Sequence, residues 1–180
     1  TVWQGLLQHM RENQLKLSTV KRVLIGGSAV PEAHVRIFQE EFGIEVVQGW
    51  GMTETSPIGT LSNLLPEMEG WSQDEQIKYR VKQGIPPLGI DLKLEDDDGN
   101  RLPHDGETYG RLLIKGPTVA AAYFKGEGSI LDKDDFFDTG DVATIDPLGY
   151  MQITDRAKDV IKSGGEWISS IEIENLAVGH

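Results

Sequence analysis

The chain has 180 residues, of which 38% are hydrophobic and 26% are charged, so it is long enough to bury one sizeable core. Its formal net charge of -12 argues against a nucleic-acid partner, because phosphate binding relies on clustered Lys and Arg. The lack of cysteine excludes a disulfide framework and a thiolate zinc site, and it fits a reducing, cytoplasmic compartment. No apolar run approaches the ~20 residues of a membrane span, so we expect no transmembrane segment.

The first part of the chain predicts an α/β unit. Apolar residues at helical spacing indicate an amphipathic helix over residues 1–14, and a β-branched run over 20–25 indicates a strand. Pro31 opens a second helix that Gly43 ends, and a strand over 44–48 follows. This order is a βαβ unit of a parallel sheet, in which ligands bind beyond the carboxyl ends of the strands. We therefore expect the loops GGSAVP and GWGMTETSP, one after each strand, to line one crevice.

The second of these loops carries several groups suited to a nucleotide. Gly49 and Gly51 allow backbone to approach a ligand closely, and Trp50 between them offers a flat face for a base. Thr53 supplies a hydroxyl for a phosphate oxygen, and Glu54 supplies a hard carboxylate that suits Mg²⁺. The alternative is a tight turn with a buried Trp and a capping Thr-x-x-Ser.

The rest of the chain predicts surface structure and then a small β unit. Residues 60–84 read as a polar loop with a short helix. After residue 84, short strands separated by turns indicate a small antiparallel sheet or barrel packed on the α/β part, over residues 90–95, 109–115, 142–145 and 150–153. A new small unit begins near Lys158, with a helix expected over 168–177.

The run from Phe136 to Trp167 holds two polar clusters on a predicted hairpin. Strands over 142–145 and 150–153 are joined by the turn Asp-Pro-Leu-Gly, so Asp141 and Arg156 should come to the same end. A carboxylate beside a five-donor guanidinium suits a sugar diol next to a phosphate. The alternative is a hairpin with a surface salt bridge, which stabilises little.

Several other stretches resemble known binding motifs but lack residues that those motifs require. Asp96-Asp97-Asp98-Gly99 lacks the alternating spacing and the closing Glu of a calcium loop, so we expect a hairpin turn. The sequence holds no P-loop signature, and Gly126-Glu127-Gly128 lacks the third glycine of a dinucleotide fingerprint. The four histidines are scattered, which gives no support to a histidine metal site or a Ser-His-Asp triad.

Four motifs of this chain, in their order, resemble those of the adenylate-forming superfamily of acyl-CoA synthetases, nonribosomal adenylation domains and beetle luciferases. The motifs are GWGMTET, GRLLIKGP, FFDTGD and DRAKDVIKSGGEWIS. The resemblance covers essentially the whole chain. Trp50, where Tyr is more usual, makes the chain look most like bacterial medium- and long-chain fatty-acid–CoA ligases and ligases for methylthio-propionate. The resemblance implies that residues 1–157 are the C-terminal part of a large AMP-binding domain, with an α/β portion (1–83) and a β subdomain (84–157). Residues 158–180 would then be the truncated start of a mobile α+β domain.

The resemblance also implies roles for residues around the nucleotide. The first loop would lie against adenosine and the substrate carboxylate, through Gly26, Gly27 and Ser28. The second would border the adenine and the acyl pocket, through Gly49, Trp50, Gly51 and Met52. Thr53 would contact the α-phosphate and Glu54 would ligate Mg²⁺. Asp141 would hold the ribose hydroxyls, Arg156 the ribose and phosphate side, and Ile153 would pack on the adenine.

Beyond the hairpin, the resemblance places the CoA side of the reaction. Lys158 matches the hinge on which the small domain pivots. Lys162 would serve in catalysis, and with the turn Ser163, Gly164 and Gly165 it would swing toward the pantetheine tunnel. The implied cofactors are ATP, Mg²⁺ and CoA, and the implied reaction makes a fatty acyl-adenylate and then a thioester.

Two parts of the family pattern are missing from this sequence, an upstream phosphate loop with its lysine and a downstream adenylation lysine. We therefore expect that the chain alone cannot make acyl-adenylate. Two alternatives stay open: an adenylation enzyme that loads a carrier protein, and a non-catalytic nucleotide-binding module. Apolar surface at truncated ends favours association, and a homodimer is one expectation for the full-length protein.

Overall fold

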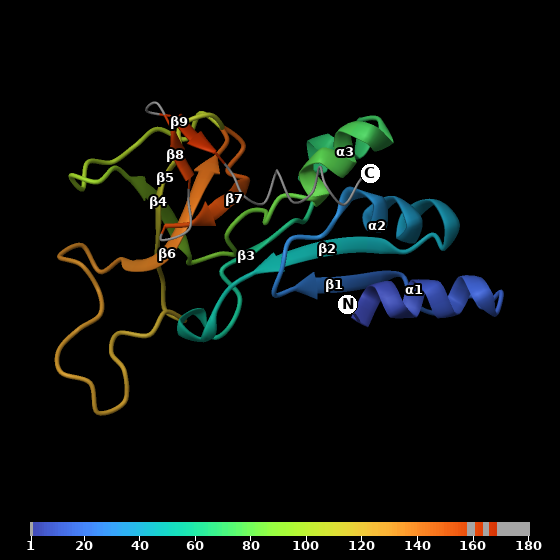
Figure 1. Ribbon diagram of the computed structural model, residues 1–180, viewed down its shortest axis with the longest axis horizontal. Helices are drawn as coiled ribbons and strands as arrows, with labels where there is room; N and C mark the ends of the chain where they lie inside the picture. The colour runs from blue at the N-terminus through green and yellow to red at the C-terminus, as the bar shows by residue number, and fades with distance from the viewer. Residues whose placement is uncertain (1, 158–160, 164–165, 169–180) are drawn as a thin grey trace.

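A computed structural model describes residues 2–157, 161–163 and 166–168 (Figure 1). Lys158, Gly164 and Gly165 lie outside these residues, as does the predicted helix over 168–177 apart from its first residue. No helix in the described part of the chain combines the length and apolar character of a membrane span.

The first unit is a βαβ arrangement, as predicted. β1 (Arg22–Gly26) pairs in parallel with β2 (Glu45–Trp50), from Arg22↔Glu45 to Gly26↔Gly49. α1 (Val2–Glu12) precedes them, and the connecting helix begins as α2 (Glu32–Arg36). That helix continues as a π-helical turn, η1 (Ile37–Glu41), so it is α-helical over only part of the predicted span. Its buried face completes a core with residues that include Val35, Phe38, Ile44 and Val46.

The connection to the second unit holds short elements. It comprises the 3₁₀ turns η2 (Thr53–Thr55) and η3 (Pro66–Gly70), the two-residue strand β3 (Thr60–Leu61), which the sequence did not predict, and α3 (Gln73–Arg80). Ser72 caps α3 by accepting from the backbone N–H of Glu75 at 3.3 Å. The buried Arg80 fastens α3 to β2, because its Nη1 lies 2.9 Å from Oε1 of Glu45.

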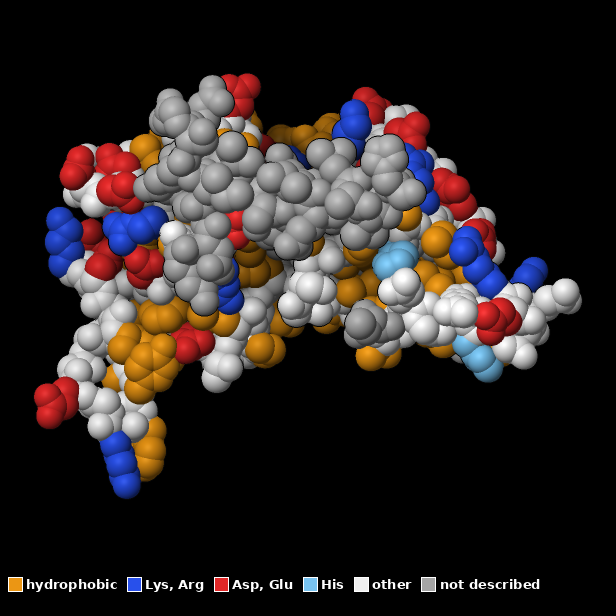
Figure 2. All heavy atoms as spheres, in the orientation of Figure 1, with side chains coloured by type: hydrophobic (Ala, Val, Ile, Leu, Met, Phe, Trp, Pro, Cys, Tyr) orange, Lys and Arg blue, Asp and Glu red, His pale blue; other side chains and the backbone are white. Residues whose placement is uncertain are grey.

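The second unit is an antiparallel sheet in the order β4-β5-β6-β7, which confirms the predicted change of fold after residue 84. Its strands are β4 (Asp91–Glu95), β5 (Gly110–Lys115), β6 (Phe137–Ile145) and β7 (Met151–Arg156). β6 begins earlier than predicted, so Thr139, Gly140 and Asp141 lie within a strand. A hairpin of β8 (Ile161–Ser163) and β9 (Glu166–Ile168) follows. Acidic and basic side chains intermingle over this unit (Figure 2), where Lys93 and Arg111 pair with neighbouring carboxylates.

Residues 83–85 join the two sheets, and we call them the inter-sheet seam. On one side Leu61 and Ile85 exchange backbone hydrogen bonds of 3.0 Å each, and on the other Met151 N–H donates to the Gly84 carbonyl at 2.8 Å. Gly84 has a φ of +93°, and a Cβ there would lie 2.0 Å from the carbonyl oxygen of Leu61. The seam brings the carboxyl ends of β1 and β2 to face the antiparallel sheet (Figure 1).

Candidate functional site

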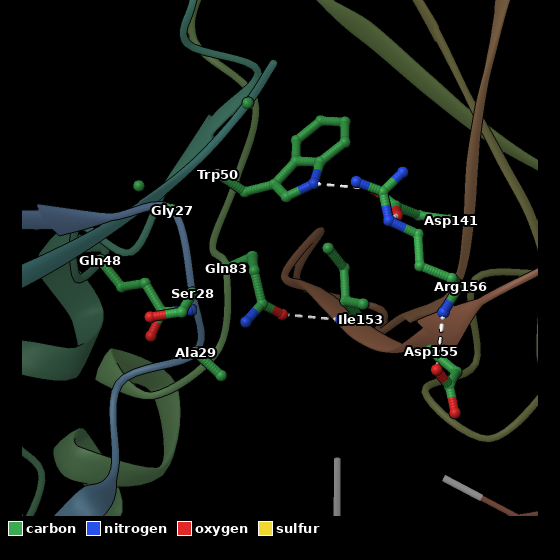
Figure 3. A pocket seen from close by; sticks show the side chains of 12 residues that line it. Gly27, Ser28, Ala29, Gln48, Trp50, Gln83, Asp141, Ile153, Asp155 and Arg156 are labelled. Atoms are coloured by element: carbon green, nitrogen blue, oxygen red, sulfur yellow. Dashed lines mark hydrogen bonds and ion pairs between the residues drawn. The ribbon is translucent and has the colours of Figure 1, made fainter. Parts of the chain in front are cut away.

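A pocket of about 310 Å³ lies where the two sheets meet, and residues from the loop after β1, from β2 and the loop after it, from the seam, and from β6 and β7 line it (Figure 3). Both glycine loops contribute, as predicted. The lining consists of Gly27, Ser28, Ala29, Gln48, Gly49, Trp50, Gly51, Gln83, Asp141, Ile153, Asp155 and Arg156. Eight of these are residues that the sequence singled out. The volume is at the lower end of the range for small-molecule sites.

Asp141 has a charged partner at one carboxylate oxygen and a hydrogen-bond donor at the other. The hairpin register pairs Asp141 with Arg156, whose Nε lies 3.1 Å from Oδ1. Nε1 of Trp50 donates to Oδ2 at 3.0 Å. The Asp141 side chain is 5% exposed while that of Arg156 is 54% exposed, so this is not an ordinary surface pair. A buried acceptor fixed from two sides leaves lone pairs for hydroxyl groups of a ligand.

The protonation of Asp141 reflects its burial. Burial raises the pKa of Asp141 above its usual value, and the nearby Asp138 acts in the same direction. The charge of Arg156 and the hydrogen bond from Trp50 oppose that shift. The carboxyl group is therefore more easily protonated than an exposed aspartate, and its charged partner limits the effect.

Gly51 lines the pocket, and close packing also requires a glycine at this position. A Cβ on Gly51 would lie 1.6 Å from the carbonyl oxygen of Pro57, so no larger residue fits this turn. The sequence argument assigned this glycine to close approach of a ligand alone. Gly26, also predicted, pairs with Gly49 inside the sheet and is not among the lining residues.

Thr53 and Glu54 form the turn η2 beyond the pocket and do not belong to its lining. Tyr123 donates its hydroxyl to Oε1 of Glu54 at 2.8 Å, and the Ala120 N–H donates to the Glu54 carbonyl at 2.8 Å. The carboxylate raises the pKa of Tyr123 through this hydrogen bond. Met52, which directly precedes this turn, packs against the core of the antiparallel sheet.

The donor set fits a magnesium ion held jointly with phosphate. No cluster of three or more His, Cys, Asp or Glu suited to a metal occurs among the described residues, so they form no all-protein cage. Glu54 is partly exposed, and with Oε1 turned to Tyr123 the carboxylate keeps further lone pairs free. One carboxylate together with substrate phosphates is a usual arrangement for Mg²⁺.

Sequence reasoning assigned no individual role to four lining residues, Ala29, Gln48, Gln83 and Asp155, although Ala29 belongs to the first predicted loop. Gln48 is a polar residue at the end of a buried strand, which is a signal that could have found it. Its Oε1 accepts from the Val30 N–H at 3.0 Å. Gln83 lies in a polar stretch without periodicity, so no local pattern points to it. Lys162 and Ser163 belong to β8, and their side chains are outside what the structure describes.

Comparison with known proteins gives three results. The family model described as AMP-binding enzyme matches residues 1–124. The 3-methylmercaptopropionyl-CoA ligase of Ruegeria lacuscaerulensis is 51% identical over 180 residues, 100% of this chain and 33% of that protein. The medium-chain-fatty-acid–CoA ligase of Ectopseudomonas oleovorans is 48% identical over 179 residues, 99% of this chain and 33% of that protein.

Among solved structures, the o-succinylbenzoate CoA synthetase of Bacillus subtilis with its acyl-adenylate intermediate superimposes with a TM-score of 0.78 at 28% identity. The match covers 98% of this chain and 34% of that one. The chain thus spans about a third of the length of the relatives it matches.

Proposed function

We propose, since this chain belongs to the AMP-binding enzyme family, that the whole protein is an acid–thiol ligase. It activates a carboxylic acid with ATP as an acyl-adenylate and transfers the acyl group to CoA. The observation that carries this proposal is the pocket between the two sheets, where the buried Asp141 is fixed beside Arg156. A carboxylate and a guanidinium on one hairpin match a ribose diol and the adjoining phosphate.

The pocket walls supply the other contacts of adenosine. Asp141 accepts from the ribose hydroxyls, and the half-exposed Arg156 faces the ribose and phosphate side. Ile153 offers an apolar surface to the base, and Gly27 and Ser28 lie opposite it on the loop after β1 (Figure 3). Gly49, Trp50 and Gly51 form the border between the base and the acid.

The phosphates extend toward the turn after β2. Thr53 donates its hydroxyl to the α-phosphate, and Glu54 would hold Mg²⁺. A bound Mg²⁺ would supply neutralisation of phosphate charge, and the residues of the chain contribute mainly positioning. Tyr123 restrains the Glu54 carboxylate through its 2.8 Å hydrogen bond. Gly26 and Met52 support the two loops from outside the pocket lining.

The second half-reaction would use the residues that follow β7. We assign residues 1–157 to the large domain, with its α/β portion (1–83) and β subdomain (84–157), and 158–180 to the start of a mobile domain. Lys158 is the proposed hinge. The CoA-side residues are proposed to be Lys162, Ser163, Gly164 and Gly165. The 180-residue chain alone is expected to be inactive.

The acid is proposed to be a fatty acid, with a short thioether acid as the competing substrate. One relative named above is a medium-chain-fatty-acid–CoA ligase and another is a 3-methylmercaptopropionyl-CoA ligase. An assay of the full-length protein for AMP and acyl-CoA across both classes of acid ranks them. Acyl-AMP without thioester, or transfer only to a carrier protein, would contradict a CoA ligase.

A pair of neighbouring variants tests the nucleotide site. Asp141→Asn removes the buried charge, whereas Asp138→Asn changes an exposed aspartate on the same strand that pairs with Arg111. We expect the first to lower ATP affinity and turnover at least about tenfold and the second to leave both within about twofold. Equal effects of the two variants would refute the ribose role of Asp141. Acid-dependent pyrophosphate exchange by the 180-residue polypeptide alone would refute its predicted inactivity.

A further inference from the structure

We propose that Gln83 recognises the base, donating a hydrogen bond from Nε2 to an acceptor nitrogen of the purine ring. The inference rests on the proposed nucleotide site and adds a specificity residue to it. Gln83 belongs to the inter-sheet seam and lines the pocket between the Asp141–Arg156 pair and the loop after β1 (Figure 3).

The orientation of the Gln83 amide is fixed by its neighbours. Ile153 presents a backbone N–H, which can only donate, and it lies 2.7 Å from Oε1 of Gln83. The amide therefore cannot be reversed, and Nε2 must point away from β7. The backbone is held too, because the Thr60 hydroxyl donates to the Gln83 carbonyl at 2.6 Å.

The amide nitrogen has no hydrogen-bond partner among the described residues, although the Gln83 residue is only 6% exposed. Figure 3 shows the nitrogen turned from Ile153 toward the open space facing Ser28 and Ala29. The N–H group reaches the pocket space, because Nε2 of Gln83 is not one of the fully buried side-chain atoms that lack a partner in the described part of the chain. A ligand acceptor at this position replaces water there and pairs with a donor whose direction is already fixed.

The position of Gln83 determines which part of the ligand it meets. Asp141 and Arg156 lie at the end of the hairpin and take the ribose, while Ile153 lies further along β7 and flanks the base. Gln83 contacts Ile153 directly, so its free N–H group faces the base edge and not the sugar. Adenine carries ring nitrogens N1, N3 and N7 as acceptors, and each is removed singly in the corresponding deaza analogue.

The test measures dissociation constants of the full-length protein for ATP and for 1-, 3- and 7-deaza-ATP. Gln83→Glu keeps an oxygen for the Ile153 N–H and removes the amide donor. We expect the wild-type protein to bind one of the three analogues about three- to tenfold more weakly than ATP. Gln83→Glu should lose that discrimination, so that it binds ATP and this analogue alike. A uniform loss caused by the new charge cancels in the ratio.

Gln76→Glu is the matched control, because it also replaces an amide by a carboxylate but lies outside the pocket. There, Nε2 of Gln76 donates to the Met68 carbonyl at 2.9 Å. This variant should keep the wild-type ratio for all analogues. If Gln83→Glu does not fold, Gln83→Met, which has no donor and a similar volume, must show the same loss of discrimination.

Three outcomes count against the inference. Equal wild-type affinity for all four nucleotides, or unchanged discrimination in both Gln83 variants, overturns the role of Gln83 while ATP binding and acid activation leave the proposed function intact. A wild-type protein that binds no ATP overturns the proposed function and this inference together.

Discussion

The indole Nε1 of Trp50 donates a hydrogen bond to Oδ2 of Asp141 at 3.0 Å, across 91 residues of chain. The bond ties the loop after β2 to β6 of the second sheet. It leaves the ring of Trp50 on the pocket wall and holds the carboxylate oxygen that Arg156 does not contact (Figure 3). The aromatic residue at this position therefore has a polar function as well as a flat face.

Trp50→Phe tests that polar function. Phe keeps an aromatic face but lacks the N–H, so Asp141 loses this hydrogen bond and keeps its ion pair with Arg156. We expect ATP affinity of the full-length protein to fall about three- to tenfold, measured by calorimetry. Trp71→Phe is the control, since Trp71 packs edge-on against Tyr79 at 5.4 Å and is not part of the pocket. Unchanged affinity in Trp50→Phe would show that the indole N–H is dispensable.

The raised pKa of Asp141 gives the nucleotide affinity a pH dependence. A protonated carboxyl group is a poorer acceptor for the ribose hydroxyls, so affinity for ATP should fall with decreasing pH. The fall should begin at a higher pH than for an aspartate with the usual pKa of 3.8. The contribution to stability has the opposite direction. The folded state holds the proton more tightly, so stability from this group is lost as pH rises through the unfolded and then the folded pKa.

Arg156 sets the position of that pH dependence. Its charge lowers the pKa of Asp141, so Arg156→Gln should move the midpoint of affinity loss to higher pH, whereas Arg156→Lys should keep it near the wild-type value. ATP dissociation constants measured from the usual aspartate value of 3.8 up to about pH 8 give the midpoints. A midpoint that moves to lower pH in Arg156→Gln would contradict the assignment of the titrating group to Asp141.

Tyr123→Phe should increase the Mg²⁺ requirement. The hydroxyl orients the Glu54 carboxylate at 2.8 Å, and loss of a group that orients a metal ligand typically weakens the metal about tenfold. The apparent Mg²⁺ dissociation constant at saturating ATP measures the effect, and added Mg²⁺ should restore turnover. Tyr109→Phe is the control, because its hydroxyl makes no hydrogen bond to Glu54 in the described structure. A lower turnover that Mg²⁺ does not restore would point to a different role for Tyr123.

Gly84→Ala should destabilise the protein by about 2–4 kcal/mol, because the new Cβ meets the Leu61 carbonyl in a backbone conformation with positive φ. The seam would have to separate, which weakens the join between the sheets. Gly70→Ala is the control, since nothing lies within 4 Å of its Cβ position. Urea midpoints of the full-length protein compare the two, and a Gly84 variant as stable as the Gly70 variant would contradict the role of the seam.

Local pattern was enough for the longer strands of the two sheets and for one side of the site, but not for the short strands β3, β8 and β9. The turn residues of the β6–β7 hairpin placed Asp141 and Arg156 at the same end, because neighbouring segments meet through a short turn. Their direct pairing depends on a register shift between Val142 and Ala143, which the local pattern did not predict. Strand–helix–strand order placed the two glycine loops at one edge of a parallel pair. The π-helical turn and the early start of β6 escaped prediction, because both depend on packing rather than on periodicity.

The sequence by itself determined the fold class, the two glycine loops and the Asp141–Arg156 pair, since each follows from contacts within a short stretch of chain. Only the tertiary structure decided what else meets them. The bond from Trp50 to Asp141 spans 91 residues, the contact of Gln83 with Ile153 spans 70 and that of Tyr123 with Glu54 spans 69. Such contacts depend on how the two sheets dock along the seam, and local periodicity carries no information about that docking.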